Sequence, residues 1–277
     1  MTTNRKSYLL FLLALLTLAA ACGPAKQEQT GEAEAPAPQL QQDYASLVWQ
    51  AHNGRQWAKQ KALRADVNLQ FGGNTLVDGT MTMLTNTAKV RIDQRDSLKS
   101  CLIWTGETAT VSPAASTQRS ARFHLLTWPY FLAAPFKISD PGTFMEEQGV
   151  DSVTGKPADV ARLSFASGVG DSPDDWYILY KDPKNDQLQA MAYIVTFGGQ
   201  SKEKAEADPH AIRYEHYTEV DGVLIADQWT FWAWREGEGL TEQLGQASLS
   251  NIQFLEPEAG FFEVPADHRI DALPGRE

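Results

Sequence analysis

The stretch 212–234 constrains the fold most, because it encodes a β-hairpin whose second arm is unusually aromatic. At its centre, Asp221 and Gly222 lie between two runs rich in β-branched and aromatic residues. An Asp-Gly pair in this setting predicts a two-residue type I′ turn, in which both residues adopt positive φ. The sequence therefore predicts two antiparallel strands that meet at residues 221 and 222.

The second arm of this hairpin carries large aromatic side chains on both faces. Trp229 and Phe231 share one face of the predicted strand, whereas Trp232 and Trp234 share the other. Such a strand is either enclosed between two core layers or has one face on a cavity. Hydrophobic periodicity does not distinguish these two interpretations.

The first residues indicate export to the cell envelope. Arg5 and Lys6 precede an apolar run at 8–18, which is too short to cross a bilayer comfortably. Alanines at 19–21 and then Cys22 follow, and this pattern resembles the lipobox of bacterial lipoproteins. The resemblance implies that a signal peptide, residues 1–21, is removed and that acylated Cys22 anchors the protein to a membrane. An ordinary or uncleaved signal sequence with a chance cysteine is the alternative.

Cysteine content and charge exclude several classes of protein. If Cys22 is acylated, Cys101 is the remaining one of two cysteines, so an intramolecular disulfide is excluded. The apolar run around Cys101 predicts a buried thiol, not a nucleophile. The net charge is −11, without a basic cluster, which argues against nucleic acid and against charge-driven binding to anionic lipids.

The composition divides the exported chain into two parts. Residues 22–40 are rich in Ala, Pro, Glu and Gln and contain little to bury, which predicts a disordered, solvated tether. Residues 41–277 are expected to form a single domain of sufficient size to build one sheet-based core.

A short helix and a series of strands are predicted in this domain. Asp43 is expected to cap the helix, and Asn53 and Gly54 to end it. Closely spaced strands with turn residues between them indicate an antiparallel sheet. The expected strands are 62–71, 75–84, 89–95, 98–111, 160–165, 176–181, 188–197 and 246–255, besides the hairpin.

The segment 116–138 interrupts the strands with an apolar, helix-like pattern. Thr127 and Pro129 predict the start of a second short helix, and Pro135 predicts its end. Because the segment is apolar nearly all round, we expect it to be buried or to face a cavity.

No catalytic residue, cofactor site or metal site is predicted. The sequence contains no phosphate-binding loop, nucleophile elbow or zinc-binding helix motif. His210 and His216 would lie roughly 20 Å apart on one strand, beyond the reach of a single metal ion. Asp171, Asp174 and Asp175 cluster in a Gly/Pro loop without EF-hand spacing, and we interpret them as a solvated acidic loop and not a calcium site.

Two polar residues lie near the start of the apolar insertion. Arg122 and His124 flank its apolar positions, and we interpret them as groups at the rim of a cavity, not as catalysts. No nucleophile and base can be paired from the sequence.

The order helix, antiparallel strands, apolar helical insertion and further strands resembles the LolA/LolB-like lipoprotein-carrier superfamily. It looks most like an uncharacterised family of Bacteroidota lipoproteins. The resemblance implies a mainly β domain, a curved and incomplete antiparallel β-barrel, with a helical lid that shields an apolar cavity for acyl chains. The stretches that carry it are 128–131, 217–223, 229–231 and 262–265.

One position departs from that superfamily. In the soluble carrier, a basic residue after an early strand latches the helical lid, whereas residues 85–87 of this chain are Thr-Asn-Thr. The resemblance therefore supports the fold, but the specific task of ferrying lipoproteins does not follow from it.

The sequence favours a non-enzymatic, membrane-anchored lipoprotein that binds a lipid or another acylated molecule. Phe131, Leu132, Trp229 and Phe231 are the candidate lining of its cavity, although Trp232 and Trp234 could equally point inward. The alternative is a structural or interaction lipoprotein with a filled core, and an envelope hydrolase is the least supported. The expected location is the outer membrane, facing the periplasm or, alternatively, the cell surface. No protein partner is named by the sequence.

Overall fold

The computed structural model describes residues 43–274. The predicted signal peptide 1–21, the lipidation site Cys22 and the tether 22–40 lie outside these residues. Within residues 43–274, no helix is both long enough and apolar enough to cross a bilayer.

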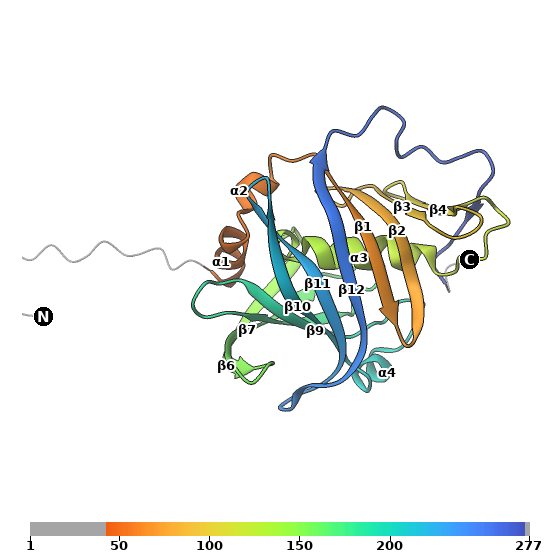
Figure 1. Ribbon diagram of the computed structural model, residues 1–277. Coiled ribbons are helices and arrows are strands. Elements are labelled where there is room, and N and C mark those ends of the chain that lie inside the picture. Colours follow the sequence, from red (N-terminus) through yellow and green to blue (C-terminus); the bar gives the residue numbers. More distant parts are fainter. Residues whose placement is uncertain (1–42, 275–277) are drawn as a thin grey trace, which may run out of the picture. The chain divides into compact units, whose positions relative to one another are not determined.

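A single antiparallel sheet organises the domain, in the order β13-β5-β4-β3-β2-β1-β12-β11-β10-β9-β8-β7-β6 (Figure 1). The edge strands β13 and β6 pair with β5 and β7 but not with each other, so among the described residues the barrel stays open. The predicted curved, incomplete antiparallel barrel is therefore confirmed. The strands are β1 (Ala62–Phe71), β2 (Asn74–Leu84), β3 (Val90–Gln94), β4 (Cys101–Trp104), β5 (Ala109–Ser112), β6 (Thr143–Ser152), β7 (Pro157–Phe165), β8 (Trp176–Lys181), β9 (Leu188–Tyr193), β10 (His210–Val220), β11 (Val223–Arg235), β12 (Gly239–Leu255) and β13 (Arg269–Ile270).

Strand β12 joins two meanders into one sheet. The first meander is β1–β5 and the second is β6–β11, and β12 pairs with β1 on one side and with β11 on the other. Ala247 lies opposite Leu69 of β1 and opposite Trp229 of β11. Strands far apart in the sequence thus share a continuous inner face.

The predicted central hairpin is confirmed. Val220 pairs with Val223, and the two turn residues between them, Asp221 and Gly222, have φ values of 48° and 77°. The side-chain amide of Asn53 donates to the carbonyl of Gly222 at 2.7 Å, which ties this turn to the N-terminal helices.

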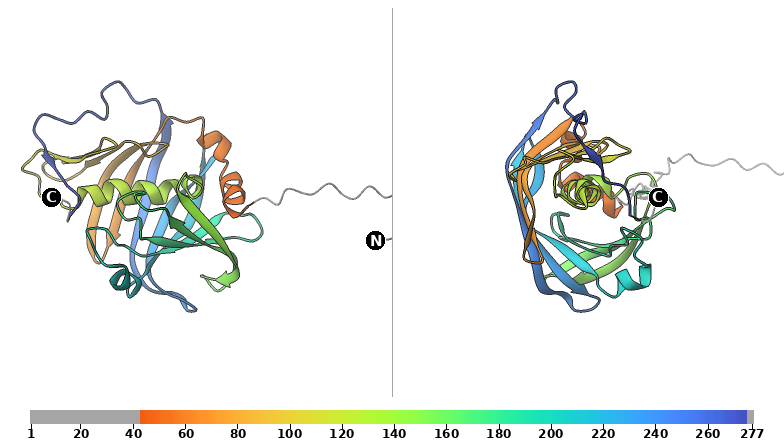
Figure 2. Two further views of the ribbon diagram at one scale, coloured as in Figure 1. Left: turned by 180° about the vertical axis from the view of Figure 1, so that it is seen from behind. Right: turned by 90° about the vertical axis from the view of Figure 1, so that its right-hand side faces the viewer.

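Two short helices open the described part of the chain, and a long one lies inside the curve of the sheet. Asp43 caps the first helix as predicted, because its carboxylate accepts from the N–H of Ser46 at 2.7 Å. Figure 2 shows the long helix nearly end-on within the curved sheet. The helices are α1 (Tyr44–Ala51), α2 (Gly54–Trp57), α3 (Ala121–Lys137) and α4 (Lys202–Glu206).

Helix α3 is continuous, so the predicted break in the apolar insertion is wrong. It runs for 17 residues with Pro129 and Pro135 inside it. Proline lacks the N–H that would bond to the carbonyl four residues earlier, which for Pro135 is the carbonyl of Phe131. The hydroxyl of Tyr214, on β10, donates to that carbonyl at 2.8 Å. A tertiary hydrogen bond therefore replaces the missing helical one.

The start of α3 is held by the C-terminal part of the domain. Ser120 has φ 54° and provides no side-chain cap. Instead, Asp271, just after β13, accepts from the N–H of Arg122 at 2.9 Å. A carboxylate at this end also complements the helix dipole.

Several strands have other bounds than the sequence predicted, and some elements were not predicted. The expected strand 98–111 is two strands, β4 and β5, because residues 105–108 form a turn in which the N–H of Thr105 donates to the carbonyl of Thr108 at 3.1 Å. Strand β12 begins seven residues before the predicted 246. Strands β6 and β13 and helix α4 were not predicted, and β6 is exposed along most of both faces, so it lacks the period-two pattern.

Strand β11 carries buried aromatic side chains on both faces, at Trp229, Phe231 and Trp234, whereas Trp232 is half-buried. Trp229 and Phe231 are 1% and 0% exposed and belong to the inner core with α3. Trp234 belongs to an outer core, where its indole N–H donates to the hydroxyl of Tyr180 at 3.2 Å and its ring meets that of Trp176 edge-on at 6.1 Å. Of the two interpretations that the sequence left open, the enclosed strand is the one observed.

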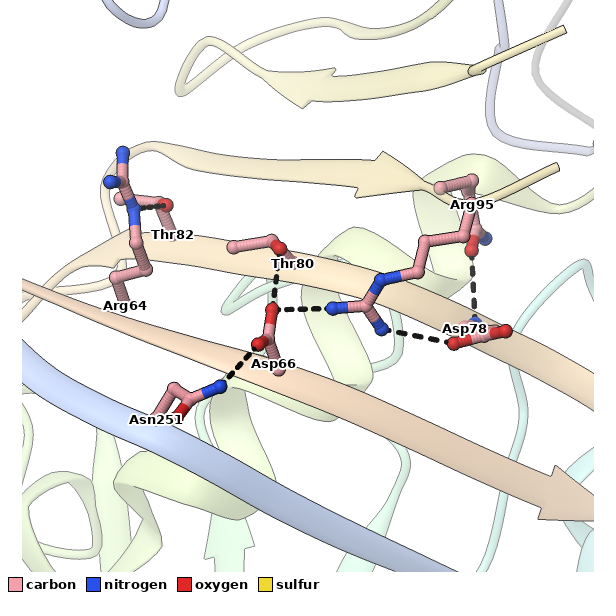
Figure 3. A network of polar contacts seen from close by, with 8 residues as sticks. Arg64, Asp66, Asp78, Thr80, Thr82, Arg95 and Asn251 are labelled. Carbon is pink, nitrogen blue, oxygen red and sulfur yellow. Dashed lines mark hydrogen bonds and ion pairs between the residues drawn. The ribbon is translucent and has the colours of Figure 1, made fainter.

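The outer face of the first meander is polar instead. Asp66 accepts from Thr80 at 2.7 Å, from Asn251 at 2.8 Å and from Arg95 at 2.6 Å, and Arg95 also binds Asp78 (Figure 3). Hydrogen bonds from Thr80 and Asn251, together with the nearby Arg95 charge, hold the pKa of Asp66 below its ordinary value. This network joins β1, β2 and β12 on the face away from α3.

Candidate ligand cavity

A cavity of about 410 Å³ lies between α3 and the second meander. Helix α3 packs against α1, α2 and strands β3–β5. Its other side faces β7–β9 and the loop 166–175, where side chains line the cavity without filling it. The apolar and aromatic lining includes Phe123, Leu126, Tyr130, Phe131, Phe165, Tyr177, Tyr193 and Phe197.

Aromatic rings form a continuous wall of this cavity. Tyr177 and Tyr193 lie opposite each other on β8 and β9, with ring centroids 6.1 Å apart. Tyr177 contacts Tyr130 of α3 at 5.6 Å and Phe165 of β7 at 5.8 Å, and Phe131 contacts Tyr193 at 5.0 Å. Such a surface is suited to contact with a hydrocarbon chain.

An ion pair connects α3 to the loop that borders the cavity. Arg122 binds Asp171 with two parallel hydrogen bonds of 2.5 and 2.8 Å, and the two side chains are only 15% and 14% exposed. The guanidinium also lies 4.8 Å from the ring centre of Trp104. Arg122 is thus placed at the rim, as interpreted from the sequence, but its role is to bind a loop that the sequence suggested was solvated.

A second charged contact links the end of α3 to the turn between β2 and β3. Lys137 pairs with Asp140, and its ammonium donates to the carbonyl of Asn86 at 3.4 Å. Residues 85–87 are the stretch where the sequence lacked a basic residue. Here the basic residue comes from the helix and the acceptor from the turn.

Asp175 is the acidic residue of the cavity without a cationic partner in the described part of the chain. Its carboxylate accepts from the backbone N–H and the hydroxyl of Thr196, at 2.7 and 2.8 Å. Burial raises the pKa of Asp175 to about 6, against the opposing effect of these hydrogen bonds. Desolvation thus dominates at this position.

The hydroxyl of Tyr130 has no hydrogen-bond partner among residues 43–274, although it is buried. Burial, and then the charge of Asp140, raises the pKa of Tyr130 well above its ordinary value. A buried hydroxyl without a partner is unusual, because leaving one unsatisfied costs about 1–3 kcal/mol.

The structure divides the four predicted lining residues between the cavity and the core. Phe131 lies in the wall of the cavity. Leu132, Trp229 and Phe231 are at most 2% exposed and pack in the inner core, outside the lining of the cavity. Their assignment as ligand contacts stays a prediction.

The remaining chemically active side chains are buried or paired. Cys101 is buried as predicted, and desolvation, followed by the charge of Asp93, raises the pKa of its thiol to about 12. Burial lowers the pKa of His124 to about 4, and its Nδ1 accepts from the indole N–H of Trp128 at 2.9 Å. Within residues 43–274, no group of three or more His, Cys, Asp or Glu side chains is arranged to hold a metal ion.

Sequence reasoning missed Tyr177, Tyr193 and Asp175 as cavity residues. Strands β8 and β9 are apolar on both faces, so their pattern does not indicate which face is inside. Tyr177 and Leu179 point inward, whereas Ile178 points to the outer core. Tyrosine alone is no signal of the inner face, because Tyr180 of β8 lies in the outer core and accepts from Trp234.

Comparison with solved structures identifies the class of fold. A LolA superfamily protein from Nitrosomonas europaea matches with a TM-score of 0.50 over 79% of this chain and 97% of that chain, at 8% identity. A putative outer membrane lipoprotein-sorting protein domain from Vibrio parahaemolyticus matches with a TM-score of 0.49 over 78% and 94%, at 9% identity. No protein-family model and no curated protein matches the sequence. The chain has the LolA-type fold, and the resemblance drawn from the sequence is confirmed at this level.

Proposed function

We propose that the protein is a membrane-anchored envelope lipoprotein that binds a lipid or another acylated molecule in the cavity between α3 and β7–β9. The observation that carries this proposal is the aromatic cavity of about 410 Å³, which the side chains of the domain leave unfilled. Its size lies within the range of about 300–1,000 Å³ that is common for small-molecule sites. The LolA-type fold supports the proposal, since the solved structure from Nitrosomonas europaea with a similar fold is described as a LolA superfamily protein.

The chemistry of the described residues also favours binding over catalysis. The buried thiol of Cys101 is protonated at neutral pH, and the imidazole of His124 is neutral and bonded to Trp128. Neither residue lines the cavity. The polar groups that do line it suit orientation of a ligand better than activation of a nucleophile.

A structural or interaction lipoprotein is the second candidate function. It is favoured by Leu132, Trp229 and Phe231, which form solid core where the sequence suggested a cavity. In that case the space beside Tyr130 would be a packing defect and not a binding site.

Lipid extraction of the purified full-length protein, followed by mass spectrometry, separates the two candidates. Leu126 is half-buried and lines the cavity, so Leu126→Trp should fill part of it. Leu98 is 47% exposed and lies outside the cavity, so Leu98→Trp is the matched control. We expect acylated molecules with wild type and with the control, and much less with Leu126→Trp. Equal amounts in all three, or none beyond a detergent blank, would favour the second candidate.

The membrane anchor is proposed from the sequence, and it has its own test. Cys22→Ser should abolish acylation and leave the protein unprocessed or released from the membrane fraction. We further propose the outer membrane, facing the periplasm, as its location. Normal processing and unchanged partitioning of the variant would contradict lipidation at Cys22.

A further inference from the structure

A second and more polar pocket lies beside the ligand cavity, at the start of α3. Its volume is about 730 Å³, and most of its lining comes from residues 74–76 and 117–120. Phe123 and Phe197 line both this outer pocket and the cavity. Their rings meet edge-on, with centroids 5.4 Å apart. The two spaces are therefore neighbours that share one pair of aromatic rings.

The outer pocket differs from the cavity in charge. Asp140, Asp171 and Asp175 line the cavity, whereas no Asp or Glu of the described chain lines the outer pocket. The charged residue of the outer pocket is Arg119 instead. Although the whole chain has a net charge of −11, charges more than about 8 Å away are largely screened at physiological salt. The local balance therefore favours an anion in this pocket.

Arg119 is free to bind such an anion. Its side chain is exposed and has no ion pair or hydrogen bond with any residue of 43–274. The nearby Arg122 and Arg269 are already paired, with Asp171 and Asp271. Arg119 can thus turn towards an anion without breaking a contact, and its planar guanidinium matches the oxygens of a carboxylate or phosphate group.

Uncharged donors add to the polar lining. His124 is 7% exposed and lines the outer pocket. Its Nδ1 accepts from Trp128 and burial lowers its pKa to about 4, so at neutral pH the proton lies on Nε2. Nε2 has no partner among the described residues and is not one of their buried, unpartnered atoms, so solvent reaches it. The hydroxyls of Thr75, Thr117 and Ser120 likewise bond to no acceptor within residues 43–274.

The shared pair of rings can let a hydrocarbon chain pass between the two spaces. Phe123 and Phe197 are both half-buried. Phe197 lies in a turn directly before Gly198 and Gly199, which have φ values of 77° and 80°. Because glycine adopts such conformations without steric cost, the turn can move the Phe197 ring away from Phe123 while β9 stays in place.

We propose that the outer pocket binds the acidic head group of the ligand, a phosphate or a carboxylate, while its hydrocarbon chain passes between Phe123 and Phe197 into the cavity. This inference rests on the proposed function and specifies its ligand as an anionic amphiphile. Arg119 binds the head group. Asp175, without a cationic partner among the described residues, keeps that group out of the cavity.

The test measures displacement of N-phenyl-1-naphthylamine from the full-length protein at pH 8 in a non-ionic detergent. The competitors are dodecyl phosphate and 1-dodecanol, which share a chain length and differ in the charge of the head group. Both competitors and the probe also enter detergent micelles, but to the same extent for every variant. The decisive quantity is therefore the ratio of half-displacing concentrations between each variant and wild type.

Arg119→Gln removes an exposed charge without a partner, so the fold should be retained. We expect it to weaken displacement by dodecyl phosphate about 3- to 10-fold, as for the loss of one charge-assisted hydrogen bond at an exposed site, and to leave dodecanol unchanged. Arg119→Lys keeps the charge and should retain most of the affinity. Arg55→Gln is the matched control, because Arg55 is exposed and lies outside both linings, so neither competitor should change.

Two further measurements test whether head group and chain belong to one ligand. Leu126→Trp fills part of the cavity and should weaken both competitors, because both place their chain there. An excess of inorganic phosphate should leave displacement by dodecyl phosphate unchanged, since the chain supplies most of the affinity. Competition by inorganic phosphate would assign the outer pocket to free phosphate and overturn the amphiphile.

The outcomes distinguish this inference from the proposed function. If the probe shows no saturable binding to wild type, the proposed binding function fails. If the probe binds but Arg119→Gln affects both competitors equally or neither, the head-group site is wrong while the binding cavity stands. If Leu126→Trp weakens dodecanol but not dodecyl phosphate, the two spaces bind separately and the shared ligand is overturned.

Discussion

The two sides of α3 are built from similar residue types but differ in how completely they are packed. On the packed side, towards α1, α2 and β3–β5, Phe136 stacks on Trp57 at 4.2 Å, and towards β11 Trp128 meets Phe231 at 5.8 Å. On the cavity side, towards β7–β9, Tyr130 and Phe123 face space that no side chain of the domain fills. Total hydrophobicity therefore does not separate core from cavity in this helix.

Polar groups mark the difference. The cavity side carries Thr127, Tyr130 and Lys137, and it faces Asp175. On the packed side, polar atoms are present but are bonded within the protein, as with the hydroxyl of Tyr214 and the imidazole of His52. On the cavity side, Lys137 and Asp175 are bonded within the protein too, so the unpartnered hydroxyl of Tyr130 is the polar group that sets this face of α3 apart among the described residues.

The comparison predicts different costs for the same truncation on the two sides. Phe231→Ala on the packed side should lower the free energy of unfolding by about 3–5 kcal/mol, because it leaves a cavity in close-packed core. Phe165→Ala on the cavity side should cost clearly less, because Phe165 is half-buried and already borders free space. Chemical denaturation of both variants tests this, and equal costs would show that the two sides are packed alike.

The pH dependence of stability should have opposite signs on the two sides. Burial lowers the pKa of both His52 and His124 to about 4, so the unfolded state binds protons more readily than the folded state. Stability should therefore fall as the pH drops from about 6.5 to about 4, by up to about 3 kcal/mol for each histidine. Burial raises the pKa of Asp175, so its contribution is fully present below about 3.8 and is lost as the pH rises through about 6.

Denaturant titrations from pH 8 to pH 4 measure these contributions. His52→Gln should reduce the loss of stability between about pH 6.5 and about pH 4. His268→Gln, at an exposed position, is the control and should leave that loss unchanged. Asp175→Asn should be more stable than wild type at pH 8, and this gain should vanish towards pH 4. If His52→Gln loses as much stability in acid as wild type does, His52 is not a source of the acid sensitivity.

The hydrogen bond that crosses from β10 to α3 should be coupled to the proline in the helix. Tyr214→Phe leaves the carbonyl of Phe131 without a donor and should cost about 1–2 kcal/mol. In a Pro135→Ala background, the restored N–H of residue 135 can donate to the same carbonyl, so the cost should be smaller. A double-mutant cycle measures this coupling, and a coupling energy of zero would mean that Tyr214 does not replace the helical bond.

The smallest expected effects concern two arginines in different surroundings. Arg122→Ala breaks a shielded ion pair at the cavity and should cost about 1 kcal/mol or more, because Asp171 is left buried and unpaired. Arg95→Ala breaks its pairs with Asp78 and Asp66, in which the arginine is 48% exposed and the carboxylates are 50% and 25% exposed, and should cost about 0–1 kcal/mol. Thermal melts at low and high salt measure the loss of stability in each variant. A larger, salt-sensitive loss for Arg95→Ala than for Arg122→Ala would contradict this ranking.

The sheet was predictable because its signals are local. The alternation in β1 and β2, the turn at Asp221 and Gly222 and the cap at Asp43 each need only neighbouring residues to be interpreted. The continuity of α3 was not predictable, since it depends on Tyr214, which is 83 residues away from Phe131.

The candidate site was only partly predictable for a similar reason. Phe131 was identified from the apolar pattern of its segment, but the partners that make the wall come from β7, β8 and β9. Which face of β8 turns inward depends on the curvature of the whole sheet, and both faces of that strand are apolar. Leu132 lies in the same apolar segment as Phe131, and only tertiary packing separates the two.

The hydrogen bond between the N–H of Arg122 and Asp271 has a consequence for the order of assembly. It joins residues 149 positions apart, and Arg269 of β13 also donates to the carbonyl of Gln118 just before α3. Loop closure over such a span adds entropy cost, so this contact belongs to the late, non-local steps of folding. We therefore expect helix α3 to be fully seated only after β13 has docked on β5. Detachment of Arg269 and Ile270 from β5 would release the start of α3. This part of the molecule could then open locally while the central strands stay folded.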